Sequence, residues 1–283
     1  MPTLASPNNP KIKQIRLLRQ RKQREATGLF VVEGIHHVGE AVAAGAGVEY
    51  ICYAPDRLES QFARELIEQQ SALGVPCHAV TRPIFESLAE KENPQGVLAV
   101  VRQRRLTLAH LTPDTFGWGV ALVSPQDPGN VGAILRTMDA VGASGLLLLD
   151  NSVDPYHPSA VRASMGALFW LPVVQAPFAD FARWAKQRGY HLYGTSARGS
   201  LDYRAVTAYA RPMILLMGSE REGLSPEQRA VCDQLIRLPM KGRVSSLNLA
   251  VAAGVMLFEI AAKSEEERAY SAVSSSAKSD TGE

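Results

Sequence analysis

The stretch Leu216-Met-Gly-Ser-Glu-Arg-Glu-Gly223 places a glutamate between two glycines, directly after an apolar run. Two other stretches have the same design, Asn130-Val-Gly-Ala-Ile-Leu-Arg136 and Leu238-Pro-Met-Lys-Gly-Arg-Val-Ser-Ser-Leu-Asn248. Each combines a turn rich in Gly, Ser or Asn with an apolar helical segment, and each carries polar side chains that a buried core excludes. Three such turns in one segment of the chain predict a single composite site.

Apolar strands alternate with helices around these turns. The expected strands are 118–123, 145–149, 173–174, 190–194, 213–217 and 234–238, and the expected helices are 131–142, 160–167, 178–188, 226–232 and 247–262. This alternation predicts an α/β fold with a largely parallel sheet that is covered on both faces. Open sheets of this kind bind ligands at the C-terminal ends of their strands, which is where all three turns fall.

The first hundred residues predict a smaller α/β unit that begins with a basic helix at 11–23. Strands are expected at 29–32, 50–53, 75–80 and 96–101, with helices at 36–44, 60–72 and 85–89. We expect a first domain at 1–103, a linker at 104–116, a second domain at 117–263 and a tail at 264–283. The tail is rich in Ser, Glu and Lys and is expected to be disordered.

The formal net charge of +2 conceals an uneven distribution. Residues 1–25 carry seven Lys and Arg residues against one Glu, a net charge of +6, which leaves −4 for the rest of the chain. A concentrated basic segment is typical of contact with a phosphate backbone, and it fits a solvated amphipathic helix equally well. The basic side chains that we assign to RNA contact are Lys11, Lys13, Arg16, Arg19 and Lys22.

Cysteine usage and hydropathy bear on the compartment. The three cysteines, Cys52, Cys77 and Cys232, form no CxxC pair, and the histidines show no metal-ligand spacing, so neither a disulfide framework nor a metal site is expected. Reduced cysteines indicate a cytoplasmic protein. No apolar run is long enough for a membrane span, and no apolar signal region opens the chain.

Each of the three turns also has a purely structural interpretation. Asn130 can cap a helix that begins at Val131, with Arg136 paired to Asp139. Glu220 can be an exposed turn carboxylate, and Ser246 or Asn248 can cap the last helix. A dinucleotide cofactor and a nucleoside triphosphate lose support, because the chain has no GxGxxG after a strand and no Walker A loop. Ser-His-Asp hydrolysis loses support as well, because no G-x-S-x-G elbow occurs.

Taken in order, the three stretches closely resemble the signatures of the SpoU-type, TrmH-like RNA ribose 2′-O-methyltransferases of the SPOUT superfamily. The matching residues are Asn130, Gly132 and Arg136 in the first stretch, Gly218, Glu220 and Gly223 in the second, and Pro239, Gly242, Ser246, Leu247 and Asn248 in the third. The segment from Ser6 through Gly34 resembles the substrate-binding domain often joined to such enzymes, which is similar to RNA-binding ribosomal proteins. Arg162–Ala167 also looks like a family segment.

The resemblance implies a deep C-terminal trefoil knot, a homodimer, and transfer of a methyl group from S-adenosylmethionine to a ribose 2′-hydroxyl without a metal. It implies a catalytic set of Asn130, Arg136, Glu220, Ser246 and Asn248. It places the methyl donor at Thr195, Gly218, Leu238, Met240 and Leu247. Ribosomal RNA is favoured as the substrate. A transfer RNA, a non-catalytic RNA-binding or ribosome-assembly role, and an α/β transferase with another acceptor remain as alternatives.

Overall fold

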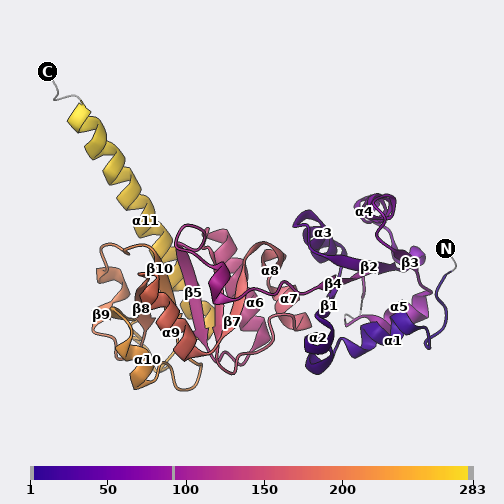
Figure 1. Ribbon diagram of the computed structural model, residues 1–283, viewed down its shortest axis with the longest axis horizontal. Helices are drawn as coiled ribbons and strands as arrows, with labels where there is room; N and C mark the ends of the chain where they lie inside the picture. The colour runs from indigo at the N-terminus through magenta and orange to yellow at the C-terminus, as the bar shows by residue number, and fades with distance from the viewer. Residues whose placement is uncertain (1–2, 91–92, 280–283) are drawn as a thin grey trace. The chain divides into compact units, whose positions relative to one another are not determined.

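The computed structural model describes residues 3–90 and 93–279, with side chains placed through residue 264, and the chain divides into two compact units (Figure 1). Unit 1 comprises Met1–Arg105 and Asp154–Trp170, and unit 2 comprises Leu106–Val153 and Leu171–Glu283. The sequence placed residues 117–263 in one domain. The structure instead packs the seventeen residues from Asp154 to Trp170 with the N-terminal part of the chain.

Unit 1 is built on a four-stranded sheet in the order β1-β4-β2-β3, in which the β2–β3 pair is parallel and the other two pairs are antiparallel. Its strands are β1 (Leu29–Glu33), β2 (Val48–Tyr53), β3 (Cys77–Ala79) and β4 (Val97–Arg102). Its helices are α1 (Pro10–Leu17), α2 (Arg21–Thr27), α3 (Ile35–Ala43), α4 (Gln61–Ala72), α5 (Arg82–Leu88), α7 (Pro158–Ala163) and α8 (Ala167–Trp170), with a short 3-10 turn, η1, at Pro55–Arg57.

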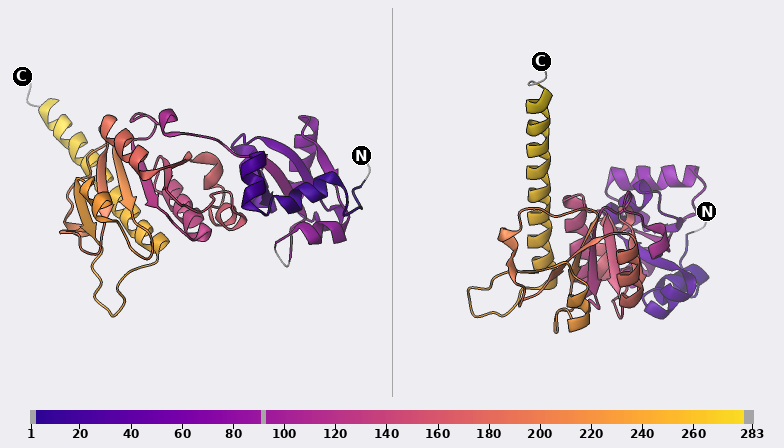
Figure 2. Two further views of the ribbon diagram at one scale, coloured as in Figure 1. Left: turned by 60° about the horizontal axis from the view of Figure 1, so that its bottom comes forward. Right: turned by 60° about the vertical axis from the view of Figure 1, so that its left-hand side comes forward.

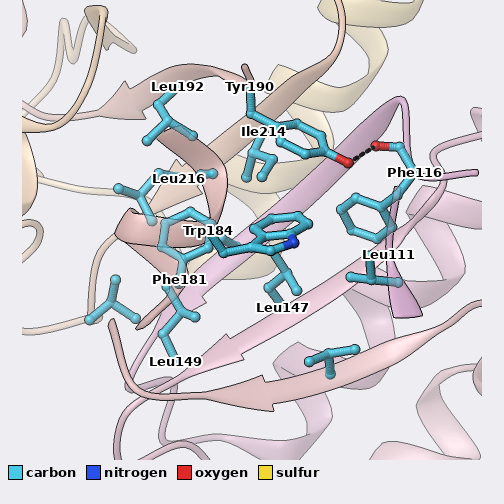
Figure 3. Packing of buried hydrophobic residues seen from close by; sticks show 14 of the residues in the cluster. Leu111, Phe116, Leu147, Leu149, Phe181, Trp184, Tyr190, Leu192, Ile214 and Leu216 are labelled. Carbon is cyan, nitrogen blue, oxygen red and sulfur yellow. Dashed lines mark hydrogen bonds between the residues drawn. The ribbon is translucent and has the colours of Figure 1, made fainter. Parts of the chain in front are cut away.

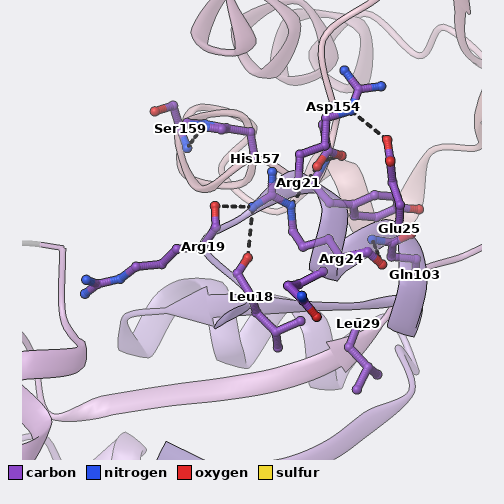
Figure 4. Close-up of polar contacts among 12 residues, drawn as sticks. Leu18, Arg19, Arg21, Arg24, Glu25, Leu29, Gln103, Asp154, His157 and Ser159 are labelled. Carbon is purple, nitrogen blue, oxygen red and sulfur yellow. Dashed lines mark hydrogen bonds and ion pairs between the residues drawn. The ribbon is translucent and has the colours of Figure 1, made fainter. Parts of the chain in front are cut away.

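The single basic helix expected at 11–23 is wrong, because the structure has two helices separated by Leu18–Gln20. The break is stabilised by Arg24, whose guanidinium turns back toward the end of α1. It donates hydrogen bonds to the carbonyls of Leu18 (2.9 Å) and Arg19 (2.8 Å) and pairs with Asp154 at 2.6 Å (Figure 4). A cation at these carbonyls stabilises the C-terminal end of α1.

The segment Asp154–Trp170 completes the hydrophobic interior of unit 1. The ring of Phe30 on β1 lies 4.7 Å from that of Tyr156 and 6.3 Å from that of Phe169. The indole nitrogen of Trp170 donates to Glu40 on α3 at 3.0 Å. These contacts join residues more than a hundred positions apart, so periodicity along the chain could not reveal them.

Unit 2 contains a seven-stranded sheet in the order β7-β6-β5-β10-β8-β11-β9, and all of its pairs are parallel, as the sequence predicted. Its strands are β5 (Trp118–Val123), β6 (Gly145–Leu149), β7 (Val173–Ala176), β8 (His191–Thr195), β9 (Leu201–Asp202), β10 (Met213–Met217) and β11 (Gln234–Arg237). Its helices are α6 (Pro128–Ala140), α9 (Phe178–Gln187), α10 (Pro226–Ala230) and α11 (Leu249–Ser279), with 3-10 turns η2 (Leu108–His110) and η3 (Tyr203–Ala205).

An aromatic cluster packs against one face of this sheet. Phe116, Trp184 and Tyr190 lie together beneath the apolar strands, and the Tyr190 hydroxyl donates to the carbonyl of Phe116 at 2.9 Å (Figure 3). Gly119 on β5 is required here, because a Cβ at this position would lie 2.1 Å from the Phe116 ring. A close-packed core on this face of the sheet therefore holds the strands that carry the site.

The last helix is longer than the sequence indicated. α11 continues to Ser279, so helical backbone covers most of the segment from 264 for which disorder was expected, and 280–283 lie outside the described residues (Figure 2). That segment contains no proline and only one glycine, at 282, and its Ala, Glu, Lys and Arg residues are strong helix formers. In the part of the chain that the structure describes, no helix is long and apolar enough to cross a membrane.

Candidate active site

The order of the strands in unit 2 brings the three turns together. β5, β10, β8 and β11 are consecutive neighbours in the sheet, although β5 and β10 lie far apart in the sequence. Because all four run parallel, their C-terminal ends emerge at one edge. The loop into α6 follows β5, the Gly218–Gly223 turn follows β10, Thr195 ends β8, and the loop into α11 follows β11.

The second turn folds back closely on itself. The amide of Gly223 donates to the carbonyl of Ser219 at 3.0 Å, and a Cβ on Gly218 would lie 2.0 Å from the carbonyl carbon of Gly223. Gly223 has φ +68°, a left-handed conformation that glycine adopts without strain. The turn therefore needs both glycines, and it holds Glu220 at its exposed tip.

Hydrogen bonds connect the polar residues of all three turns. The Asn248 side-chain amide donates to Oδ1 of Asn130 at 3.1 Å, and the Asn130 amide donates to Oε1 of Glu220 at 3.4 Å. Asn248 also caps α11, because its Oδ1 accepts from the backbone amide of Ala250 at 2.9 Å. The capping interpretation of Asn248 is thus confirmed, and the same side chain reaches a second turn with its other polar atom.

The capping interpretation of Asn130 is wrong. α6 begins at Pro128, and Asp127 caps it by accepting from the amide of Gly129 at 2.7 Å. Proline is favoured at the first helical position because its φ is already helical and its missing N–H costs nothing there. Asn130 consequently lies inside the first turn, where its side chain is available to Glu220 and Asn248.

A cavity of about 500 Å³ opens at this edge of the sheet. Every residue that the resemblance assigned to the methyl donor lines it, namely Thr195, Gly218, Leu238, Met240 and Leu247. Glu220 and Ser246 from the catalytic set line it as well. Asn130 and Asn248 do not line it and reach it through the hydrogen bond to Glu220.

Arg136 lies apart from this cavity. It is exposed on α6 and is not among the lining residues. The Arg136–Asp139 pair of the structural interpretation is absent from the ion pairs of the residues that the structure describes. Three lining arginines were missed by the sequence reasoning, Arg198, Arg221 and Arg229. Arg221 lies within the second turn itself, which is the signal that could have found it.

The basic residues of unit 1 divide into two groups. Arg16 on α1 donates to the hydroxyl of Ser87 at 2.9 Å, and Arg19, just after α1, donates to the carbonyl of Leu88 at 3.1 Å, so both hold this part of the chain to the end of α5. The ammonium of Lys11 lies 4.2 Å from the centre of the Tyr50 ring. Lys13 and Lys22 are exposed, and neither has a recorded partner among the described side chains.

Within 3–90 and 93–264, no group of three or more His, Cys, Asp or Glu side chains is arranged to hold an ion. The polar residues at the sheet edge are instead amides, hydroxyls and guanidinium groups with one carboxylate in the hydrogen-bond chain. Fold and site together define an α/β protein with a ligand cavity built by loops at the carboxyl edge of a parallel sheet.

Comparison with known proteins specifies this class further. Residues 118–258 match the SpoU rRNA Methylase family, and residues 9–99 match the MRM3-like substrate binding domain. A 23S rRNA (uridine(2479)-2'-O)-methyltransferase from Streptomyces viridochromogenes is 35% identical over 86% of each chain. A 23S rRNA (guanosine(2553)-2'-O)-methyltransferase from Bacillus subtilis is 28% identical over 92% of this chain and 99% of its own.

Solved structures agree with these matches. The AdoMet-bound rRNA methyltransferase from Sinorhizobium meliloti has a TM-score of 0.84 and 36% identity, covering 92% of this chain and 97% of its own. The SpoU methyltransferase AviRb from Streptomyces viridochromogenes, in complex with AdoMet, has a TM-score of 0.82 and 33% identity over 90% and 98%. The chain belongs to the SpoU rRNA methylase family, as its three turns predicted.

Proposed function

We propose that this protein transfers a methyl group from S-adenosylmethionine to a ribose 2′-hydroxyl of ribosomal RNA. The observation that carries the proposal is the hydrogen-bonded chain from Asn248 through Asn130 to Glu220, which joins three distant turns beside one cavity. Relatives that match most of the chain are named for 2′-O-methylation of 23S rRNA, and this favours ribosomal over transfer RNA.

The cavity fits the methyl donor in size and lining. About 500 Å³ lies within the range of roughly 300–1,000 Å³ that is typical of small-molecule sites. Leu238, Met240 and Leu247 offer an apolar wall for an adenine ring, while backbone at Thr195 and Gly218 offers polar groups for its edges. When bound, the donor supplies an activated methyl group, so the chain's own residues mainly need to orient the acceptor hydroxyl, whose proton passes to solvent as its oxygen takes the methyl group.

The hydrogen-bond chain gives each polar residue a defined task. Asn130 fixes the direction of the Glu220 carboxylate, and Asn248 fixes Asn130 while it is held by the first turn of α11. Glu220 and Ser246, which line the cavity, would orient the ribose of the acceptor. Pre-positioned groups of this kind lower a barrier by removing the entropy cost of alignment.

We assign Arg136 to the oxyanion or to the phosphate beside it. A guanidinium keeps its proton far above neutral pH, so a donor of hydrogen bonds to developing negative charge is its natural role. Arg136 lies outside the cavity of its own chain, and we therefore propose that a homodimer brings it to the site of a second copy. Val251, Val255 and Phe258 form an exposed apolar stripe on α11, which packs against α6, and this stripe supports such an interface.

The deep trefoil knot is part of the same proposal. Segment 196–199 runs very close to β11, because a Cβ on Gly199 would lie 2.8 Å from the carbonyl carbon of Ile236. Close passage of two backbones is what a threaded loop requires. An experimental chain trace in which no segment passes through a loop of the chain would contradict the knot. The methyltransferase proposal would stand unchanged. We expect the enzyme to act in the cytoplasm.

The decisive test maps alkali-resistant positions in ribosomal RNA from cells with and without the protein. A 2′-O-methyl group removes the nucleophile of backbone cleavage, so one nucleotide should become alkali-sensitive in cells that lack the protein. If the alkali-resistant positions of ribosomal RNA stay the same and one in transfer RNA is lost, the substrate is a transfer RNA. No change in either RNA, with no donor binding by calorimetry, would favour a non-catalytic RNA-binding protein.

Replacement of Arg136 provides the first residue-level prediction. Arg136→Ala should lower kcat by roughly 100-fold or more, as expected for the loss of a charged group at a developing oxyanion. Donor affinity, measured by calorimetry, should stay within about twofold, because the role assigned to Arg136 is at the acceptor oxygen or its phosphate and not at the donor. Turnover near the wild-type value would remove Arg136 from the mechanism.

A further inference from the structure

Three arginines line the cavity at the edge of the unit 2 sheet, and two of them have no assigned task. Arg229 is held by the fold, because its Nη1 donates to the carbonyl of Leu224 at 2.8 Å. Arg198 and Arg221 are exposed, and no partner for either guanidinium is recorded in the described part of the chain. They stand on the loops that follow β8 and β10, which are neighbouring strands.

The charge of the methyl donor does not account for these two arginines. S-adenosylmethionine has a sulfonium and an ammonium against one carboxylate, so it binds as a net cation. Glu220 and Glu222 are the lining groups of opposite sign to those two positive charges. Two free guanidinium groups at the same cavity would weaken donor binding unless an anion joins them.

We propose that Arg198 and Arg221 bind phosphates of the RNA backbone next to the ribose that is methylated. Guanidinium groups match the geometry of phosphate oxygens and form charge-assisted hydrogen bonds with them. Backbone phosphates flank every ribose, so an acceptor hydroxyl presented to this cavity brings its own anions with it. The inference rests on the proposed function and adds a phosphate grip in unit 2, separate from the basic helices of unit 1.

This arrangement couples the two substrates. With RNA absent, the donor meets two unneutralised cations at the cavity, whereas bound phosphate neutralises them. RNA should therefore tighten donor binding, and by reciprocity the donor should tighten RNA binding by the same factor. The coupling should weaken as salt rises, because exposed charges are screened.

The test compares wild-type protein with the double variant Arg198→Ala, Arg221→Ala. The RNA probe is ribosomal RNA extracted from cells that lack this protein. The donor is titrated by calorimetry without RNA, and a donor analogue with an amine in place of the sulfonium, which cannot transfer a methyl group, is titrated with and without RNA. The double variant should raise the Kd for RNA roughly 10-fold or more. The slope of log affinity against log salt should fall by about two, one for each lost phosphate contact.

Donor affinity supplies the discriminating measurement. In the absence of RNA, the double variant should bind the donor as tightly as wild-type protein or more tightly, because two like charges are gone. A donor Kd that rises 10-fold would assign the arginines to the donor's carboxylate and overturn the proposal. RNA affinity and salt slope equal to wild type would overturn it as well.

Arg188→Ala is the matched control, since Arg188 is an exposed arginine of unit 2 outside the cavity. It should leave the RNA Kd within about twofold. The outcome for the proposed function is read separately. Wild-type protein that binds donor but leaves the RNA unmethylated would contradict the methyltransferase assignment. The RNA affinity and salt slope of the variants would still show whether Arg198 and Arg221 bind phosphate.

Discussion

Arginine serves opposite purposes in the two units. In unit 1, Arg24 is 1% exposed, and its guanidinium is satisfied by one carboxylate and two carbonyls. In unit 2, Arg198 and Arg221 are exposed beside a cavity without recorded partners in the described chain. A cation whose hydrogen bonds are completed within the fold stabilises it, whereas a cation left open at a cavity is available to a ligand.

Breaking the buried pair gives the largest expected effect. Arg24→Ala should lower the free energy of unfolding by about 3–5 kcal/mol, because Asp154 would stay buried without its partner. Two carbonyls at the end of α1 would also lose their donor. Urea unfolding followed by circular dichroism measures the change.

Arg21→Ala is the control for that prediction. Arg21 pairs with Glu25 at 2.6 Å, but both side chains are more than half exposed, so the loss should be below about 1 kcal/mol. Equal losses in the two variants would contradict the distinction between a cation satisfied inside the fold and one at its surface. The exposed pair also shows why a count of basic residues in 1–25 could not separate structural from functional cations.

The sequence predicted the fold of unit 2 well, because the patterns that define its strands and helices involve residues close together in the chain. The apolar strands expected at 118–123 and 213–217 are decided within a few residues, and the structure has both. The break between α1 and α2 was missed because its cause, Asp154, lies 130 residues away. The same reason hid the packing of Asp154–Trp170 with unit 1.

The site was predictable as a set of turns, and its geometry was not. Glycine spacing indicated that Glu220 is held by a tight turn, but only the strand order shows that Asn130 reaches it. Arg198 carried no signal, because an isolated arginine after a strand is common on protein surfaces. Which charges line a cavity depends on where loops meet, and periodicity does not encode that.

A steric change at the cavity gives the next largest effect. Gly218→Ala should weaken donor binding by roughly 10- to 100-fold, since the new methyl group would collide with the backbone of Gly223 and overpacking costs about 1–3 kcal/mol. Calorimetry measures the loss. Gly242→Ala in the third turn has no atom within 4 Å of the added Cβ and should bind the donor normally. Similar losses in both would mean that general loop flexibility, rather than the close turn, controls the site.

Two thiols, one in each unit, give an effect that appears only at high pH. Burial raises the pKa of Cys52 in unit 1 to about 12 and that of Cys232 in unit 2 to about 11. Both folded-state values lie above the ordinary thiol value of about 8.5, so each neutral thiol contributes stability below that pH. This contribution is lost as pH rises toward 11–12, and the melting temperature should begin to fall above about pH 9.

Alkylation by iodoacetamide tests the shift at Cys232, which is partly exposed, because only the thiolate reacts, whereas the fully buried Cys52 is also shielded from the reagent. At pH 8 the native protein should react at Cys232 roughly 100-fold more slowly than the urea-unfolded chain does, and at Cys52 more slowly still. The rate at Cys232 should rise about tenfold for each pH unit while the fold persists. A native Cys232 that reacts as fast as the unfolded one would show that this side of unit 2 opens to solvent, and the order of the two thiols would then reflect local opening instead of burial.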